Sequence, residues 1–356
     1  MSGKPRTQRE VWIDVAKGMA IALVVLDHAR HLLTLTEMPV HPVWSWVGET
    51  FASVRMPAFF MISGFFLFKW KERGWRAFVK GKVASFFYLY LVWATVYFVV
   101  DGLLVRHLDD RVLHLTRSGP IQHILRVDTP LWYLAALPVF SLVWWWTRTW
   151  PAWIPVTLAS LGYFGTQWGV IRWPHLISTV FTIGLAHYLF AFLIGARATG
   201  IIRRLIPRAK PWHLLVTFTV WMLMVFFPPP LKGLLFFVSV PTLFMFAALV
   251  ASSPRASRPF LLMGRRSLPI YVTHWLLIEV QLGITLRWID DWPAWTGTFT
   301  TPLLWISSIL IALGIWHATN AWHWLWARPD PDPVPVLSDV VDAPRVERPS
   351  GFHRLR

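Results

Sequence analysis

The chain of 356 residues contains no cysteine and little charge. The first absence excludes disulfides, thiolate metal ligands and any covalent mechanism through an acyl-cysteine. Charged residues make up only 15% of the chain, against about 25% in soluble globular proteins. Hydrophobic residues reach 55% and the mean hydropathy is +0.49. This composition excludes a soluble enzyme and indicates a protein that lies in a membrane.

Acidic residues are also scarce, with 18 Asp and Glu against 34 Lys and Arg, which gives a formal net charge of +16. In a soluble chain such an excess would suggest a nucleic-acid partner. In a membrane protein, the distribution of Lys and Arg among the loops indicates instead which loops lie in the cytoplasm. We therefore expect membrane lipids as partners and no nucleic acid.

Ten apolar stretches follow one another, most of them close to the length of about 20 residues that a bilayer span needs. A backbone that faces lipid must satisfy its own hydrogen bonds, so helix is the expected form. The sequence predicts an all-α fold, a polytopic transmembrane helix bundle of about ten spans. The edges of the fourth and fifth spans stay open, because little more than Thr149 and Trp150 separates them. The stretches run near residues 11–33, 47–68, 83–104, 130–147, 151–169, 176–196, 212–228, 233–251, 268–288 and 302–325.

The basic residues predict the orientation of the bundle. With both termini in the cytoplasm, the cytoplasmic segments hold 24 of the 34 Lys and Arg. We therefore expect a multi-pass protein of the plasma membrane with a cytoplasmic N-terminus at 1–10 and a transmembrane domain at 11–327. The remainder, 328–356, is rich in proline and charge and lacks helical periodicity, which predicts a disordered cytoplasmic tail.

Ionisable side chains inside a span are costly and are therefore functional candidates. Lys17 and His28 are eleven residues apart, which is about three turns of helix, so they share a face at a separation of roughly 16 Å. Asp14 lies three residues before Lys17 and can pair with it. Two plainer readings stay open: Asp14 and Lys17 as interfacial charges, and His28 as a satisfied core residue.

The segment from Asp14 to His28 resembles the opening helix of the acyltransferase 3 family of integral membrane acyltransferases, and most closely its fucose 4-O-acetylase branch. That family carries a basic residue, ten intervening residues and then a histidine, which Lys17 and His28 match. Many members have Arg at the first position. Lys keeps the charge there but lacks the bidentate fork of a guanidinium.

Three further segments resemble motifs of the same family, in the same order along the chain. Arg55–Phe66 resembles its Met-Pro-x-Phe-Phe-x-x-Ser-Gly span, and Pro130–Leu134 resembles its Pro-Leu-Trp-Phe/Tyr-Leu motif. Gly264–His274 resembles its late Gly-x-x-Ser-Leu-x-Ile-Tyr-x-x-His element. By order and span count the resemblance covers residues 11 to about 325, and four pieces in order are fairly specific.

The resemblance implies a membrane O-acyltransferase that moves an acyl group, often acetyl, onto a hydroxyl of a cell-surface carbohydrate or glycolipid. The donor it implies is a cytoplasmic acyl-CoA, acetyl-CoA in the simplest case, which acts as co-substrate. No permanently bound cofactor is expected. Nor is a metal, since no close pair of histidines has a nearby carboxylate in a plausible ligand set.

Acyl transfer to a hydroxyl needs a base for the hydroxyl proton and positive charge near the developing oxyanion. His28 is the expected base, because an imidazole titrates near neutrality, and Lys17 and Asp14 complete the catalytic candidates. Several of the substrate-binding candidates have a structural role as the alternative. It is a topology signal for Arg265 and Arg266, close helix contact for Ser63, and packing for Tyr271 and His274. Those candidates are Arg55, Ser63, Trp132, Tyr133, Arg265, Arg266, Tyr271 and His274.

Three other classes of protein compete with this interpretation. A polytopic transporter of an envelope precursor would also place charges inside its spans. A glycosyltransferase that uses lipid-linked sugars could bind a metal at Asp109 and Asp110 or at Asp290 and Asp291. A purely structural partner protein is disfavoured by the charges of the first span. Turnover of acyl-CoA by the purified protein would separate the acyltransferase from the transporter. The glycosyltransferase class, by resemblance, carries its acidic pair in the first external loop, where this chain has only Glu37 and Glu49.

Overall fold

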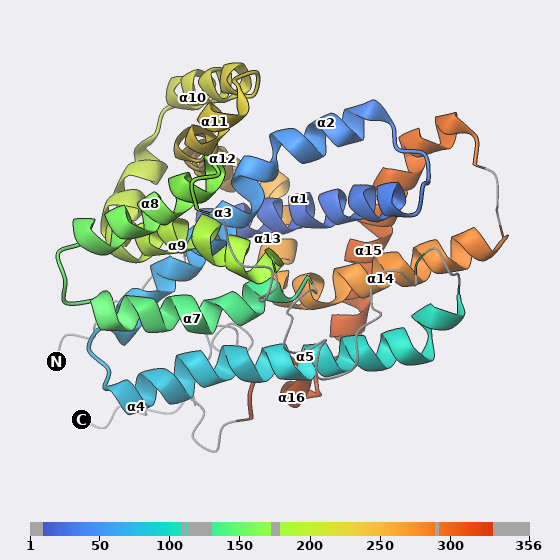
Figure 1. The fold of residues 1–356 in the computed structure, drawn as a ribbon, viewed down its shortest axis with the longest axis horizontal. Helices are drawn as coiled ribbons and strands as arrows, with labels where there is room; N and C mark the ends of the chain where they lie inside the picture. The colour runs from blue at the N-terminus through green and yellow to red at the C-terminus, as the bar shows by residue number, and fades with distance from the viewer. Residues whose placement is uncertain (1–9, 109–111, 113–129, 172–178, 289–291, 330–356) are drawn as a thin grey trace, which may run out of the picture.

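A computed structural model describes residues 10–108, 112, 130–171, 179–288 and 292–329, and every regular element in these ranges is helical (Figure 1). The all-α prediction is therefore confirmed. The predicted cytoplasmic segments at the two ends, 1–9 and 330–356, lie outside the described residues.

Each of the ten apolar stretches contains a helix. In chain order these helices are α1 (Val11–Leu35), α3 (Ala52–Phe65), α5 (Ala84–Leu103), α7 (Trp132–Thr147), α8 (Trp153–Gln167), α9 (Thr179–Leu205), α10 (Pro211–Met224), α12 (Phe236–Ala251), α14 (Ser267–Trp288) and α15 (Gly297–Thr319). Shorter helices join them, namely α2 (Pro42–Thr50), α4 (Trp75–Phe78), α11 (Pro229–Lys232), α13 (Pro254–Arg265) and α16 (His323–Trp326). Single 3₁₀ or π turns extend several of these ends, among them η1 (Phe66–Trp70), η2 (Val79–Val83), η5 (Ile206–Arg208) and η6 (Gly233–Leu235).

Five helical runs of the described chain are long and apolar enough to cross a membrane by length and composition alone. Of the other predicted spans, α7, α8 and α10 are only 16, 15 and 14 residues long, and α1 and α14 carry charged side chains. The structure is thus a polytopic membrane helix bundle, and the total of about ten spans stays a prediction. The five runs are Pro42–Trp70, Trp75–Leu103, Gly184–Arg208, Gly233–Ala251 and Ala294–Thr319.

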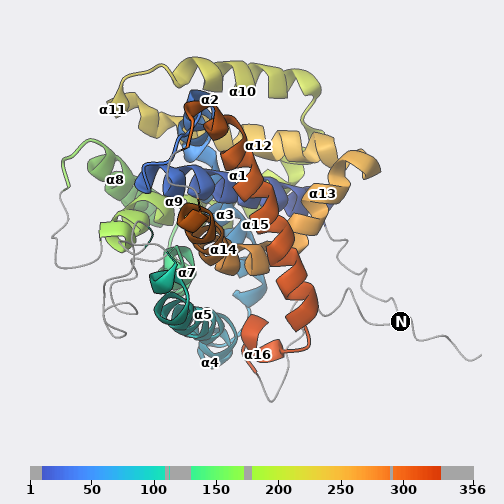
Figure 2. The same ribbon diagram turned by 90° about the vertical axis from the view of Figure 1, so that its right-hand side faces the viewer.

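Helix α1 lies inside the bundle, between α10 on one side and α5 on the other (Figures 1 and 2). It packs against α3, α12, α13, α14 and α15, and most of its residues are buried. Glycines allow the closest of these contacts. A Cβ atom at Gly18 would overlap the carbonyl oxygen of Phe260, and one at Gly264 would overlap that of Asp14. Backbone therefore touches backbone where α1 meets α13.

Helices α3 and α9 meet in the same way. A Cβ atom at Gly64 would overlap the carbonyl oxygen of Phe192, and one at Gly195 would overlap that of Met61. Small residues at such crossings let two membrane helices approach closely. This contact holds the second motif, on α3, against the centre of the bundle.

The segments predicted to be cytoplasmic gather at one end of the bundle. Arg197 of α9 donates hydrogen bonds to the carbonyl oxygens of Thr147 and Arg148 (3.0 Å to Arg148), where α7 ends. Arg203 of α9 lies 3.3 Å from the carboxylate of Glu10, just before α1. The start of α1, the turn before α10 and the end of α12 also line a common pocket.

The segments predicted to be external also meet one another, at the right-hand end of Figure 1. The indole nitrogen of Trp44 in α2 donates to the carbonyl oxygen of Thr298 at 3.0 Å, and the backbone nitrogen of His41 donates to Gly297 at 3.4 Å. The two groups of loops thus lie at opposite ends of the bundle, as successive spans require, and the side of the membrane that each end faces stays a prediction.

Two elements differ from the sequence prediction. The connection between the eighth and ninth predicted spans, for which the sequence analysis predicts no element, contains α13, which begins with Ser253 as N-cap and Pro254 at its first position. The apolar stretch at 47–68 is interrupted at Phe51, between α2 and α3. Both differences place additional helix against α1 and α3.

Candidate active site

His28 of α1 and His274 of α14 form a direct contact at the centre of the bundle. Nδ1 of His28 lies 2.7 Å from Nε2 of His274, and the two rings are nearly parallel, at 6°. His274 is fully buried, whereas His28 is half-buried and keeps part of its surface accessible. The structure therefore brings the histidines of the first and last motifs together, which sequence spacing alone did not predict.

The hydrogen bonds around this pair determine which nitrogen carries each proton. Nδ1 of His274 faces the carbonyl oxygens of Tyr271 at 2.7 Å and Ile270 at 3.1 Å, and a carbonyl can only accept. Nδ1 of His274 must therefore donate, which leaves its Nε2 as an acceptor in the neutral ring. His28 consequently donates from Nδ1, and its Nε2 keeps a free lone pair.

A substrate-binding role of His274, as the resemblance implies, stays a prediction. Its observed partner is His28, which gives it a position comparable to the group that orients a catalytic histidine in hydrolase triads. Its burial also leaves no accessible surface for a direct contact with substrate.

A network of charges lies beside His28 on α1. One carboxylate oxygen of Asp27 accepts from Arg30 at 3.0 Å, and the other lies 2.7 Å from Arg55 of α3. Arg55 also donates to the carbonyl oxygen of Gly48 at 2.8 Å. A Cβ atom at Gly48 would lie 2.6 Å from Nε of Arg30 and 2.7 Å from Oδ1 of Asp27, so a larger residue would force these side chains to shift.

This network explains how an arginine is accommodated within the second predicted span. Asp27 pairs with both Arg55 and Arg30, so the three side chains together keep one positive charge, and both arginines are close enough to His28 for their charges to act on its ring. Asp27 itself turns away from His28, as its offset of about 100° along the helix predicts.

The remaining motif residues form an aromatic wall next to the histidine pair. The hydroxyls of Ser63 and Tyr133 are 2.6 Å apart, and the ring of Tyr133 packs edge to face on Tyr271 at 5.3 Å. Tyr271 donates its hydroxyl proton to the carbonyl oxygen of Pro130. Trp132 packs on Phe60 at 5.6 Å. Segments far apart in the sequence thus meet here, one from each family motif.

A second polar group lies towards the other end of α1. Nζ of Lys17 is 2.8 Å from the carboxylate of Asp14, which confirms the predicted pairing. The end of α13 packs against this point, with Arg265 exposed. Arg266 follows, and its guanidinium stacks over the ring of Trp316 at 3.5 Å. Lys17 is therefore separated from His28 along α1, as the eleven-residue spacing predicts.

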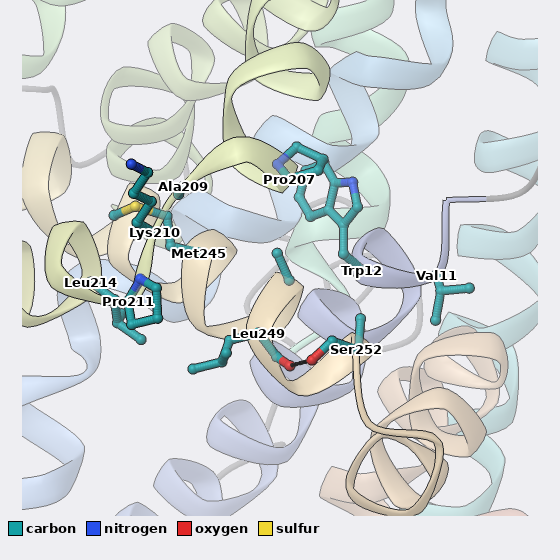
Figure 3. Close-up of a pocket in the computed structure, with 12 residues that line it drawn as sticks. Val11, Trp12, Pro207, Ala209, Lys210, Pro211, Leu214, Met245, Leu249 and Ser252 are labelled. Carbon is teal, nitrogen blue, oxygen red and sulfur yellow. Dashed lines mark hydrogen bonds between the residues drawn. The ribbon is translucent and has the colours of Figure 1, made fainter.

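A pocket of about 360 Å³ opens at the same end of the molecule (Figure 3). Trp12 at the start of α1 lies on one side, and Lys210 and Leu214 lie on the other. None of the predicted site residues lines it. In the described part of the chain no three His, Asp or Glu side chains come close enough together to hold a metal ion.

Sequence reasoning missed two residues of the site, Trp275 and Glu279 of α14. The ring of Trp275 packs on His28 at 5.1 Å, and its indole nitrogen donates to the buried carboxylate of Glu279 at 2.6 Å. The signal was present, because Glu279 is an acidic residue inside the apolar stretch 268–288.

Comparisons with known proteins agree with this architecture. A family model described as an acyltransferase domain matches residues 10–320. Over 155 residues the chain is 28% identical to the inner membrane protein YcfT of Escherichia coli (strain K12), a match that covers 38% of this chain and 43% of that protein. The match thus spans less than half of that relative's length. No solved structure matches the chain. Because the family model covers nearly all of the helical bundle, the chain belongs to the acyltransferase 3 family of membrane acyltransferases.

Proposed function

We propose that this protein is a membrane O-acyltransferase that transfers an acyl group from acyl-CoA to a hydroxyl of a cell-surface carbohydrate or glycolipid. Acetyl is the simplest acyl group, and the plasma membrane is the proposed location. One observation carries the proposal. The contact between His28 and His274 leaves the lone pair of His28 Nε2 available as a base, on a side chain that is only partly buried.

In the proposed reaction, Nε2 of His28 takes the proton of the acceptor hydroxyl as its oxygen attacks the thioester carbonyl. The tetrahedral intermediate then collapses, the carbon–sulfur bond breaks, and the imidazolium returns its proton to the thiolate of CoA. The products are the ester and free CoA, and His28 ends neutral. His274 stabilises the imidazolium, because its Nε2 accepts from the Nδ1 proton throughout.

Arg55 supplies the positive charge that this reaction needs near the carbonyl oxygen. It lies within electrostatic range of His28, and its guanidinium is held by Asp27 and by the carbonyl oxygen of Gly48. A fixed cation requires no reorganisation when the oxyanion forms, and this preorganisation is the main advantage of such a group. Tyr133 and Tyr271 form the adjacent wall, where they would meet the acceptor.

The donor is proposed to approach from the end that holds Lys17. Arg265, exposed at the end of α13, and Lys17 would attract the phosphates of CoA, and Arg266 borders the same region. The positive charges of the predicted cytoplasmic segments are compatible with this direction. The acyl group, still joined to the sulfur of CoA, would then extend along α1 to reach His28.

The test is mass spectrometry of cell-envelope glycans and lipids with and without the gene, complemented by wild-type protein or by His28→Ala at equal protein level. The proposal predicts one mass difference equal to an acyl group, restored by the wild type alone. A transporter would instead change the abundance of a whole glycan without altering its mass. Restoration of the acylated species by His28→Ala would contradict the proposal.

A further inference from the structure

Glu279 is a buried acidic side chain in the middle of α14. It is 2% exposed and lies within an apolar stretch, where an ionisable group is costly unless it has a partner. Its partner is Trp275, one turn earlier on the same face of the helix, whose indole N–H donates to the carboxylate at 2.6 Å. So short a contact is typical of a hydrogen bond to a charged or strongly polar acceptor.

Trp275 connects this carboxylate to the histidine pair. Its ring lies 5.1 Å from that of His28 at an interplanar angle of 83°, an edge-to-face contact. His28 is thus held by two consecutive residues of α14. His274 fixes its Nδ1 through a hydrogen bond, and Trp275 limits rotation of the ring.

We propose that Glu279 is a positioning residue of the active site. It fixes the indole of Trp275, and the indole in turn keeps the imidazole of His28 in the plane that directs Nε2 towards the acceptor hydroxyl. This inference rests on the proposed role of His28 as the base. The carboxylate acts as a hydrogen-bond acceptor for the indole and does not touch the reacting atoms.

This role requires an acceptor of the right shape at position 279 and does not require a charge. Glu279→Gln keeps an oxygen that can accept from the indole, so we expect at least half of the wild-type kcat. Glu279→Leu removes the acceptor and keeps the approximate volume. We expect its kcat to fall by about ten- to a hundred-fold, the effect of a misplaced catalytic group, while KM for acyl-CoA changes less than about three-fold.

Trp275→Phe should cause a similar fall in kcat, because the ring loses its anchor. Trp288→Phe is the matched control, since Trp288 lies at the end of the same helix and is 80% exposed. Its kcat should remain at the wild-type level. Each variant is made as a fluorescent fusion, and size-exclusion chromatography of the fusion measures the amount of folded protein. Activities in membranes are then compared at equal amounts of folded protein.

The double variant separates positioning from a general structural effect. If Glu279 acts through Trp275, then Glu279→Leu has no further effect once Trp275 is Phe, and the two losses are not additive. Losses that multiply would overturn the proposal, as would full kcat in Glu279→Leu. Failure of Glu279→Gln to restore activity would also overturn it, because a charge or a proton would then be required.

A measurement without turnover distinguishes this inference from the proposed function. In protein labelled with ¹⁵N-histidine, the ring signals of His28 are identified by their loss in His28→Ala. Glu279→Leu and Trp275→Phe should shift these signals, and Glu279→Gln and Trp288→Phe should not. Unchanged signals in Glu279→Leu would refute the positioning role even if acyl transfer is observed. Shifted signals in a protein that transfers no acyl group would support the contact and contradict only the proposed function.

Discussion

The hydrogen bond between the two histidines predicts a large effect for the change His274→Phe. An imidazole has two neutral tautomers, and the proposed base needs its proton on Nδ1 so that Nε2 is free. His274 enforces this tautomer, because its Nε2 lies 2.7 Å from Nδ1 of His28 and its own Nδ1 is committed to the carbonyl oxygen of Tyr271. Phenylalanine removes the acceptor and leaves the tautomer of His28 unrestrained.

The size of the effect has an upper limit, since losing the orienting group cannot cost more than losing the base. General bases contribute about 10²–10⁴-fold, so we expect kcat to fall by about 10²-fold in His274→Phe and at least as far in His28→Ala. The double variant should be no worse than His28→Ala alone. His274→Gln offers an amide oxygen as acceptor and should retain at least ten times the activity of His274→Phe.

The assay is transfer or hydrolysis of radiolabelled acyl-CoA in membranes at equal protein level. Because His274 is fully buried, the larger phenyl ring could strain the bundle by about 1–3 kcal/mol. The apparent melting temperature of each variant in detergent is therefore measured in parallel, and only variants within a few degrees of the wild type are compared. Activity of His274→Phe within a few-fold of the wild type would refute the tautomer argument.

Three further predictions follow from other parts of the molecule. Lys17→Arg should keep substantial transfer activity, whereas Lys17→Met should lose about ten- to a hundred-fold, since a hydrogen bond to a charged group contributes about 1.5–3 kcal/mol. Full activity in Lys17→Met would make Lys17 a topology signal. Gly195→Ala should destabilise the bundle by about 1–3 kcal/mol in thermal unfolding, because its Cβ would overlap Met61, whereas Gly200→Ala on the same helix meets nothing within 4 Å and should be tolerated. Reporter fusions after residues 75 and 205 should read cytoplasmic and fusions near 40 and 295 external, and a common side for 40 and 75 would contradict the predicted orientation.

Much of the fold could be predicted from the sequence because the bilayer allows few alternatives. Apolar stretches had to be helices, and each of the ten contains one. Successive spans alternate in direction, so Arg203 and Glu10 meet at one end and Trp44 and Thr298 at the other. The basic residues predict which of these ends is cytoplasmic.

Helix α13 was not predicted because its polar, arginine-rich sequence has too few apolar residues to mark it as a span. It is stabilised by a Ser253 cap and by tertiary contact, since Gly264 and Gly18 let it lie directly against α1. Such contacts between backbones depend on which helices become neighbours. Sequence periodicity does not contain that information.

The candidate site could be predicted in its residues but only partly in its geometry. Helical spacing placed Lys17 and Asp14 together and turned Asp27 away from His28, and both features are observed. The pairing of His28 with His274 joins residues 246 positions apart, so no local pattern could reveal it. The narrower likeness to the fucose 4-O-acetylase branch, the acyl donor and the acceptor stay predictions.

The central claim is that His28 is the base of an acyl transfer, and its most direct test is the activity of His28→Ala. Membranes with equal amounts of wild-type or variant protein are given radiolabelled acetyl-CoA, and label in envelope glycans and lipids is measured together with free CoA. The account predicts transfer by the wild type and a loss of at least about 10²-fold in the variant, with unchanged insertion and melting temperature. Transfer by His28→Ala within a few-fold of the wild type would contradict it.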